Sequence, residues 1–222
     1  MEGDFSQGGR AGHSRPRYFC AVRTADNRVN TVLGLYDRDL ADRYGRGERR
    51  TIVRTVFQEQ LGWDPAKLEI RKFDSLSESE LLKVYEPLKR LVAGVPLQYA
   101  LGRTWFHGLH IEVGPGVLIP RPETEELVDR IVGSGIPPGK VVDIGTGSGC
   151  IALALKAAFP EAHVVGIDVS DEALAIAWRN AVRLGLDVEW KKADVLSPSF
   201  RLPVGTGLVV SNPPDVPPSG GP

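Results

Sequence analysis

The sequence predicts an α/β protein, in which a small helical bundle and a β-hairpin linker precede an open, mostly parallel sheet. From Lys140 onward, short apolar runs alternate with amphipathic helical stretches, a pattern that favours strand–helix–strand units with right-handed crossovers. Between Thr31 and Gly94 the apolar residues recur at helical spacing instead. The sheet should hold about four strands.

Composition and charge narrow the class of protein. The 222 residues are 42% hydrophobic and 25% charged, with a net charge of −1, as is typical of a soluble globular chain. Near-neutral charge disfavours nucleic-acid binding by bulk electrostatics, and no apolar run is long enough for a membrane span. The two cysteines, Cys20 and Cys150, lack metal-ligand spacing and indicate a reducing, cytoplasmic setting.

The chain divides into four segments. Residues 1–30 hold several arginines among Gly, Ser and Asp and are predicted to form a disordered tail; a basic arm that touches RNA is the alternative. Residues 31–95 form the helical domain, residues 96–120 the hairpin linker and residues 121–222 the α/β domain.

Local signals place the helices of the first domain. One helix is expected to end near Gly62, and the next to open with a capping box between Ser77 and Glu80. Pro87 should kink or divide that second helix, and Gly94 should stop it.

In the linker the period of the apolar residues changes to two. Alternation from Leu109 to Val113 predicts a strand, and Val117–Ile119 is expected to pair with it. The stretch "PRPETEELVDRIV" then predicts a helix with a proline in its first turn.

The α/β domain reads as four strands and two intervening helices. The predicted strands are "VVDIG", "AHVVGID", "VEWKKAD" and "GLVVSN", and the helices are "CIALALKAAF" and "SDEALAIAWRNAVRLG". Trp178 is expected in the core of the second helix, and Cys150 as a small packed residue.

A glycine-rich loop follows the first of these strands, where open α/β sheets bind ligands. In "DIGTGSGC" the glycines Gly145, Gly147 and Gly149 allow the backbone close approach to a ligand. The third glycine of a dinucleotide fingerprint would fall at Cys150, so that motif is not met. The loop therefore suits a nucleoside-bearing ligand that has no pyrophosphate at this point.

Two carboxylates end the next strands. Asp168 is placed to accept hydrogen bonds from both ribose hydroxyls, and Asp194 to meet the adenine edge. For Asp194, a helix cap or a solvated loop carboxylate is an equally good interpretation.

The fourth strand delivers Asn212, Pro213 and Pro214. The Asn212 side-chain oxygen and the Pro213 carbonyl can each accept one N–H of a planar amide or amino group. Holding both N–H groups positions the nitrogen and favours its pyramidal form as charge develops. A prolyl turn without chemistry is the alternative.

Together these motifs resemble S-adenosylmethionine methyltransferases of the Rossmann-like class I fold. "DIGTGSGCIALAL" resembles their first motif, and Asn-Pro-Pro resembles the signature of enzymes that methylate sp² nitrogens. "GVPLQYALGRTWFHGLHIEVGPGVLIPRPETEELV" narrows the resemblance to the glutamine methyltransferases of class I peptide-chain release factors.

The resemblance implies a function, a cofactor and a partner. The chain would use S-adenosyl-L-methionine, without a metal, to methylate the glutamine amide in the Gly-Gly-Gln motif of a class I release factor. The helical domain would dock that protein. A cytoplasmic monomer that contacts neither membrane nor nucleic acid is expected.

The resemblance also implies which residues form the site, at the positions where this sequence matches the family's motifs. The catalytic residues would be Asn212 and Pro213. The cofactor would contact Asp143, Gly145, Thr146, Gly147, Ser148, Gly149, Asp168, Asp194, Val195 and Asn212. The substrate would contact Asn212, Pro213, Pro214, Asp215, Arg121, Pro122, Glu123 and Thr124.

The sequence departs from the family pattern near its end. Asp215 stands where the family has a tyrosine that helps to wall the glutamine slot, and the family continues for some tens of residues. A C-terminally truncated sheet with the fourth strand at an exposed edge is therefore expected. Two other functions remain open. They are a non-catalytic release-factor-binding fragment and an adenine-specific nucleic-acid methyltransferase.

Overall fold

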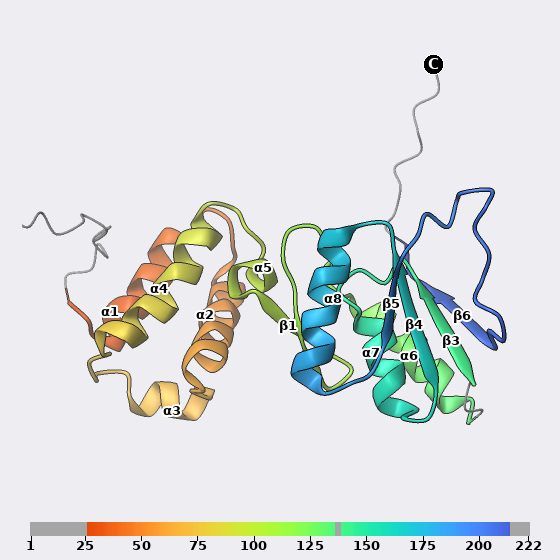
Figure 1. Ribbon diagram of the computed structural model, residues 1–222. Coiled ribbons are helices and arrows are strands. Elements are labelled where there is room, and N and C mark those ends of the chain that lie inside the picture. Colours follow the sequence, from red (N-terminus) through yellow and green to blue (C-terminus); the bar gives the residue numbers. More distant parts are fainter. Residues whose placement is uncertain (1–25, 136–138, 214–222) are drawn as a thin grey trace, which may run out of the picture.

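The computed structural model describes residues 26–135 and 139–213, which form two lobes joined by a short hairpin (Figure 1). The helical lobe contains α1 (Val29–Asp39), α2 (Arg46–Leu61), α3 (Pro65–Ile70), α4 (Glu78–Val92) and α5 (Leu97–Leu101). The hairpin consists of β1 (Arg103–Phe106) and β2 (Leu109–Glu112). The α/β lobe contains α6 (Pro122–Gly133), β3 (Lys140–Ile144), α7 (Cys150–Ala158), β4 (His163–Asp168), α8 (Asp171–Leu184), β5 (Glu189–Lys192) and β6 (Leu208–Ser211).

The predicted helix boundaries of the first lobe are confirmed at their caps. α2 ends at Gly62, whose φ of 65° is a left-handed cap that costs glycine little. α4 opens with the expected capping box, because the Ser77 side chain accepts from the Glu80 N–H and the Glu80 carboxylate accepts from the Ser77 N–H.

Two expectations for this lobe need correction. The helical unit begins before residue 31: α1 starts at Val29, and the Asn27 side chain donates to the Leu76 carbonyl at 2.7 Å. α4 is also not divided at Pro87, whereas a kink there stays a prediction. A helical proline costs about 3 kcal/mol, but burial of Leu88 and Leu91 on the same face offsets the lost hydrogen bond.

The hairpin uses a different partner strand from the one expected. β2 pairs antiparallel with β1, in the register Phe106 opposite Leu109, and not with Val117–Ile119. The turn residues His107 and Gly108 both have positive φ, 47° and 75°. Two residues with positive φ form a tight turn whose twist matches that of the flanking strands. β2 therefore pairs with β1, the strand directly before the turn.

The four strands of the α/β lobe form one parallel sheet, as predicted, and their order is β5-β4-β3-β6. After β3 the chain forms β4 on one side of β3 and continues outward to β5. It then returns to form β6 on the other side of β3. The strand order therefore reverses between β3 and β6, which is where sheets of this kind bind ligands. β6 is an edge strand among the described residues.

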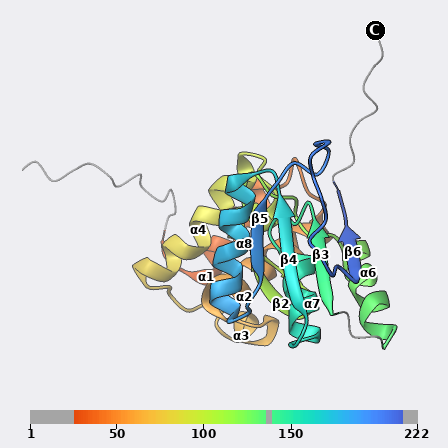
Figure 2. The ribbon, with the colours of Figure 1, turned by 45° about the vertical axis from the view of Figure 1, so that its right-hand side comes forward.

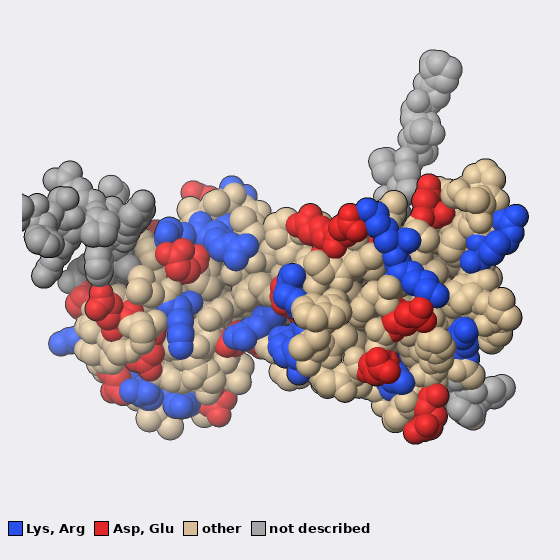
Figure 3. Space-filling view, viewed as in Figure 1, with Lys and Arg blue, Asp and Glu red and all other residues tan. Residues whose placement is uncertain are grey.

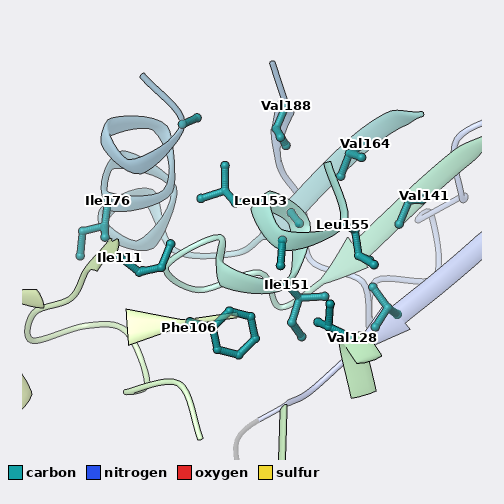
Figure 4. Close-up of a cluster of buried hydrophobic side chains, with 14 of the residues drawn as sticks. Phe106, Ile111, Val128, Val141, Ile151, Leu153, Leu155, Val164, Ile176 and Val188 are labelled. Atoms are coloured by element: carbon teal, nitrogen blue, oxygen red, sulfur yellow. The ribbon is translucent and has the colours of Figure 1, made fainter. Parts of the chain in front are cut away.

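The two faces of this sheet are covered unequally. Helices α6, α7 and α8 pack on one face, where their apolar side chains meet Val141 and Val164 (Figures 2 and 4). On the other face, within the described ranges, Val142, Val165 and Ile167 are packed by Ile144 and by the segment after β5. The core position predicted for Trp178 is wrong, because its side chain is 58% exposed on α8.

The lobes are linked through one buried carboxylate. The side chain of Glu59, near the end of α2, is only 12% exposed. It accepts hydrogen bonds from Trp105 Nε1 at 3.0 Å and lies 3.0 Å from His110 Nε2 and 3.1 Å from Arg103 Nε. A single α2 residue thus fixes the hairpin against the helical lobe.

Gly166 on β4 has no side chain, and the space beside it is occupied by the side chains of Trp190 and Thr146. A Cβ atom there would lie 2.3 Å from Trp190 and 3.0 Å from the Thr146 hydroxyl. Gly166→Ala should therefore destabilise the protein by about 1–3 kcal/mol, measured by urea unfolding.

The matched control is Gly34→Ala on the exposed face of α1, where a Cβ would meet nothing within 4 Å. That change should stabilise the protein by about 0.5–1 kcal/mol, because alanine loses less backbone entropy in a helix. Equal effects of the two substitutions would contradict the packing described for Gly166.

Candidate cofactor and substrate site

The glycine loop between β3 and α7 folds over the end of β4. The backbone N–H groups of Gly145 and Thr146 both donate to the Ile167 carbonyl, at 2.9 and 3.0 Å. Gly145, Gly147 and Gly149 all have positive φ, between 55° and 79°. This left-handed path is open to glycine and strained for other residues, so the loop shape depends on the sequence pattern.

The three glycines face different surroundings. A Cβ on Gly145 would meet nothing within 4 Å, and one on Gly147 would meet only the Gly145 carbonyl at 4.0 Å. A Cβ on Gly149 would instead lie 2.8 Å from Trp190 and 3.1 Å from Ala177. The first two glycines therefore border the open side where a ligand can approach, and Gly149 serves packing.

Side chains behind the loop hold its shape. Asp143, Thr146 and Ser148 are all at most 4% exposed. One Asp143 carboxylate oxygen accepts from the Thr146 hydroxyl at 2.6 Å and from the Ala152 N–H at 3.2 Å, which caps the first turn of α7. These side chains thus support the loop, whose open side at Gly145 and Gly147 is formed by backbone.

Burial makes Asp143 unusual. Desolvation raises the pKa of its carboxyl to about 6, although the hydrogen bonds from Thr146 and Ala152 pull in the opposite direction. Its second oxygen is buried without a partner among the described residues. The charged form is therefore held at a cost in stability.

Asp168 at the end of β4 lies beside the loop. One carboxylate oxygen accepts from the Gly147 N–H at 2.9 Å and the other from the Ser170 N–H at 3.0 Å. Each oxygen keeps a further acceptor site, so the oriented carboxylate is suited to a diol such as a ribose.

Asn212 stands on the other side of the strand reversal. Ile144 is paired with Ser211, so the residues that follow, Gly145 and Asn212, come out of the sheet next to each other. The Asn212 amide nitrogen donates to the hydroxyl of Thr124 at 2.7 Å. Its side-chain oxygen is then left to accept a hydrogen bond.

A cavity of about 310 Å³ opens at this asparagine. Its lining residues are Leu118, Arg121, Glu123, Thr124, Leu127, Asn212 and Pro213. The structure thus brings together most of the substrate residues expected from the sequence. Pro122 instead starts α6 at its first turn, and Pro214 and Asp215 lie outside the described residues.

Asp194 and Val195 are placed after β5, away from this cavity. Asp194 is exposed, and its carboxylate accepts from the Leu196 N–H at 2.9 Å in a local turn. Val195 packs against the sheet face that holds Val142. Their cofactor contacts stay predictions.

Asn180 supports the site and was missed by the sequence reasoning. It is fully buried on α8, donates to the Ser148 and Glu112 carbonyls, and accepts from the Glu112 N–H at 2.7 Å. It therefore ties the glycine loop to β2. An asparagine on the apolar face of a predicted helix was the available signal.

Leu118 and Leu127 were also missed. They add apolar wall to the cavity and had no chemical motif to mark them.

Cys150 packs against the core of the α/β lobe, as expected. Burial raises the pKa of the Cys150 thiol to about 12, which makes it a poor nucleophile. His107 pairs with Asp129 at 3.0 Å. Within the described ranges no three His, Cys, Asp or Glu side chains are arranged to hold a metal ion.

The strand order, with a site at its reversal, is that of a Rossmann-like domain, and a family model identifies it as a methyltransferase domain. The family model described as "Methyltransferase small domain" matches residues 123–216, and "PrmC N-terminal domain" matches residues 37–102. The two matches together span both lobes.

Relatives identify the family. A release factor glutamine methyltransferase of Bacteroides thetaiotaomicron is 37% identical over 188 residues, which cover 85% of this chain and 68% of that protein. The enzymes of that name from Enterococcus faecalis and Bacillus subtilis are each 38% identical, over 76% of this chain and 61% and 60% of their own lengths. The chain belongs to the release factor glutamine methyltransferase family.

The chain spans between about half and two thirds of the length of the relatives it matches. Among crystal structures, a tRNA (uracil-54, C5)-methyltransferase from Pyrococcus abyssi overlaps with a TM-score of 0.41 at 20% identity, over 50% of this chain and 28% of that one. The family assignment therefore comes from the sequence relatives.

Asp143 should make stability depend on pH. Its folded-state pKa of about 6 exceeds the ordinary value of 3.8, so the folded protein holds this proton more tightly than the unfolded chain. Relative to Asp143→Asn, the free energy of unfolding of the wild type should fall by about 2 kcal/mol between pH 4 and pH 7.

Urea unfolding of both proteins across this range measures the difference, and the same substitution at exposed Asp194 is the matched control. A difference between wild type and Asp143→Asn that stays constant with pH would rule out the buried, destabilised carboxylate.

Proposed function

We propose that this chain transfers the methyl group of S-adenosylmethionine to the glutamine amide nitrogen in the Gly-Gly-Gln motif of a class I peptide-chain release factor. The observation that carries this proposal is the placement of Asn212. It stands at the strand reversal, beside the glycine loop, with its amide nitrogen engaged by Thr124 and its oxygen left to accept.

The residues at the end of β3 and β4 fit the cofactor. Gly145 and Gly147 leave open space in front of the backbone, and Asp168 offers oriented acceptor sites for ribose hydroxyls. When bound there, the cofactor supplies an electrophilic methyl group. Asp194, after β5, is proposed to meet the adenine edge.

The chain itself would act by positioning the substrate amide. An amide nitrogen is a poor nucleophile because its lone pair is delocalised into the carbonyl. Acceptance of its two N–H groups by the Asn212 oxygen and the Pro213 carbonyl would hold the nitrogen toward the methyl donor. With the cofactor bound, the nitrogen–carbon bond would form as the methyl–sulfur bond broke, and one N–H proton would then leave to water.

The cavity suits a glutamine side chain. Leu118 and Leu127 provide apolar wall for its methylene groups, and the polar Thr124 and Asn212 lie where the amide would end. Arg121 and Glu123 are proposed as further substrate contacts. The names of the relatives support a release factor as the substrate.

The setting proposed is a monomer in the cytoplasm that does not bind nucleic acid. Acidic and basic residues are interspersed over the face seen in Figure 3, without one broad basic field. None of the described helices combines the length and apolar composition needed to cross a bilayer.

Methyl transfer from labelled S-adenosylmethionine to a purified release factor tests the proposal. The wild-type chain should label the factor, and Asn212→Ala should lower kcat by about 100-fold, as loss of one aligned polar group at a reacting centre commonly does. A release factor with alanine in place of the motif glutamine is the control. Labelling of that control, or no labelling of the normal factor, would refute the proposed reaction.

Thr124 should act as a positioning residue for Asn212. Thr124→Val keeps the shape but removes the hydroxyl that holds the Asn212 amide, so kcat should fall by about tenfold, the value of one hydrogen bond. Thr124→Ser keeps the hydroxyl and should retain most activity.

Cofactor affinity, followed by calorimetry, should be unchanged in both Thr124 variants. Equal kcat values for the valine and serine variants would show that packing alone matters at this position.

A further inference from the structure

A second cavity, separate from the one at Asn212, lies in the helical lobe. It has a volume of about 620 Å³ and is bordered by α1, α2 and α3. Leu33, Val53 and Leu68 contribute apolar surface to it. None of the residues assigned above to cofactor or glutamine binding lines this cleft.

A row of arginines on α2 forms one wall of the cleft. Arg46, Arg50 and Arg54 are spaced by four residues, which places them on one stripe of the helix, and all three line the cleft. We call them the arginine row. All three are exposed, and none makes a hydrogen bond or ion pair with another described residue.

The neighbouring Arg49, in contrast to the arginine row, has a structural role. Its guanidinium donates to Asp37 at 2.9 Å and to the Tyr44 carbonyl at 2.7 Å, and its side chain is 14% exposed. Arg49 thus pins α2 to α1, whereas the arginine row performs no such role.

The arginine row opposes the stability of its own helix. Like charges four residues apart repel by about 0.2–0.5 kcal/mol for each pair. Arg46 also stands in the first turn, where the helix dipole disfavours a cation. The arginine row therefore does not stabilise the fold. Binding of a negatively charged ligand would give a physical reason for it.

The cleft is better suited to a protein than to nucleic acid. Its apolar side chains can cover aliphatic groups of a partner, and guanidinium groups bind carboxylates in paired hydrogen bonds. Tyr36, the one aromatic residue among the described residues that line it, is buried and offers no face for a base to stack on.

We infer that this cleft binds an acidic, partly apolar segment of the protein substrate. The identity of that substrate rests on the proposed function. The segment would dock on the helical lobe while the glutamine enters the cavity at Asn212 in the other lobe (Figure 1). Docking should then govern affinity and KM, and leave kcat at saturation unchanged.

Charge reversal in the arginine row tests the inference on the full 222-residue chain. Arg50→Glu should weaken binding of a purified release factor by about fivefold or more, and Arg46→Glu/Arg50→Glu by about 25-fold, with a weaker dependence on salt. Lys83→Glu, on α4 and away from the cleft, is the matched control and should bind normally. The double variant should melt at or above the wild-type temperature, because repulsion is relieved.

A short peptide that contains the Gly-Gly-Gln motif separates docking from chemistry. It does not carry the acidic segment, so the double variant should methylate it at the wild-type rate. If no chain methylates either substrate, the proposed reaction fails.

If the peptide is methylated, the proposed reaction stands. Three results would then overturn the docking inference alone. One is wild-type affinity of the double variant for the release factor. Another is no binding of the factor by the wild type. The third is displacement of the factor by a single-stranded RNA oligonucleotide that binds through the arginine row.

Discussion

The site depends on one buried carboxylate. Asp143 ends the central strand and is held between the Thr146 hydroxyl and the Ala152 N–H, so it links the strand, the glycine loop and the first turn of α7. Burial opposes its charge and raises its pKa to about 6. The loop that borders the ligand side is therefore kept in shape by a group that destabilises the fold, a common compromise at functional sites.

Other polar groups connect this loop to the rest of the molecule. Asn180 joins it to β2, and Glu59 joins the same hairpin to α2. The two lobes have separate hydrophobic cores, so these contacts and the packing of α5 on the hairpin set their relative position. The proposed binding of a substrate by both lobes would require such a joint, since its glutamine would have to reach a fixed position.

Local rules explain why so much of the fold was predicted. Three strands of the sheet, β3, β4 and β6, have a strong apolar pattern, and the caps at Gly62 and Ser77 depend only on their neighbours. The hairpin partner was not predicted because pairing depended on a turn with positive φ at His107, which sequence patterns favour weakly. Pro87 remained helical because burial outweighed a local penalty, and only packing shows that balance.

The sequence by itself determined the order of the elements, the glycine loop, and the types of residue at Asp168 and Asn212, because these follow from short-range patterns and a family motif. Only the tertiary structure decided that Asn212 donates to Thr124, which lies 88 residues away, and that Asn180 supports the loop. It also separated ligand-facing glycines from a packing glycine. Contacts between distant segments depend on how helices and strands pack, and no local pattern encodes that arrangement.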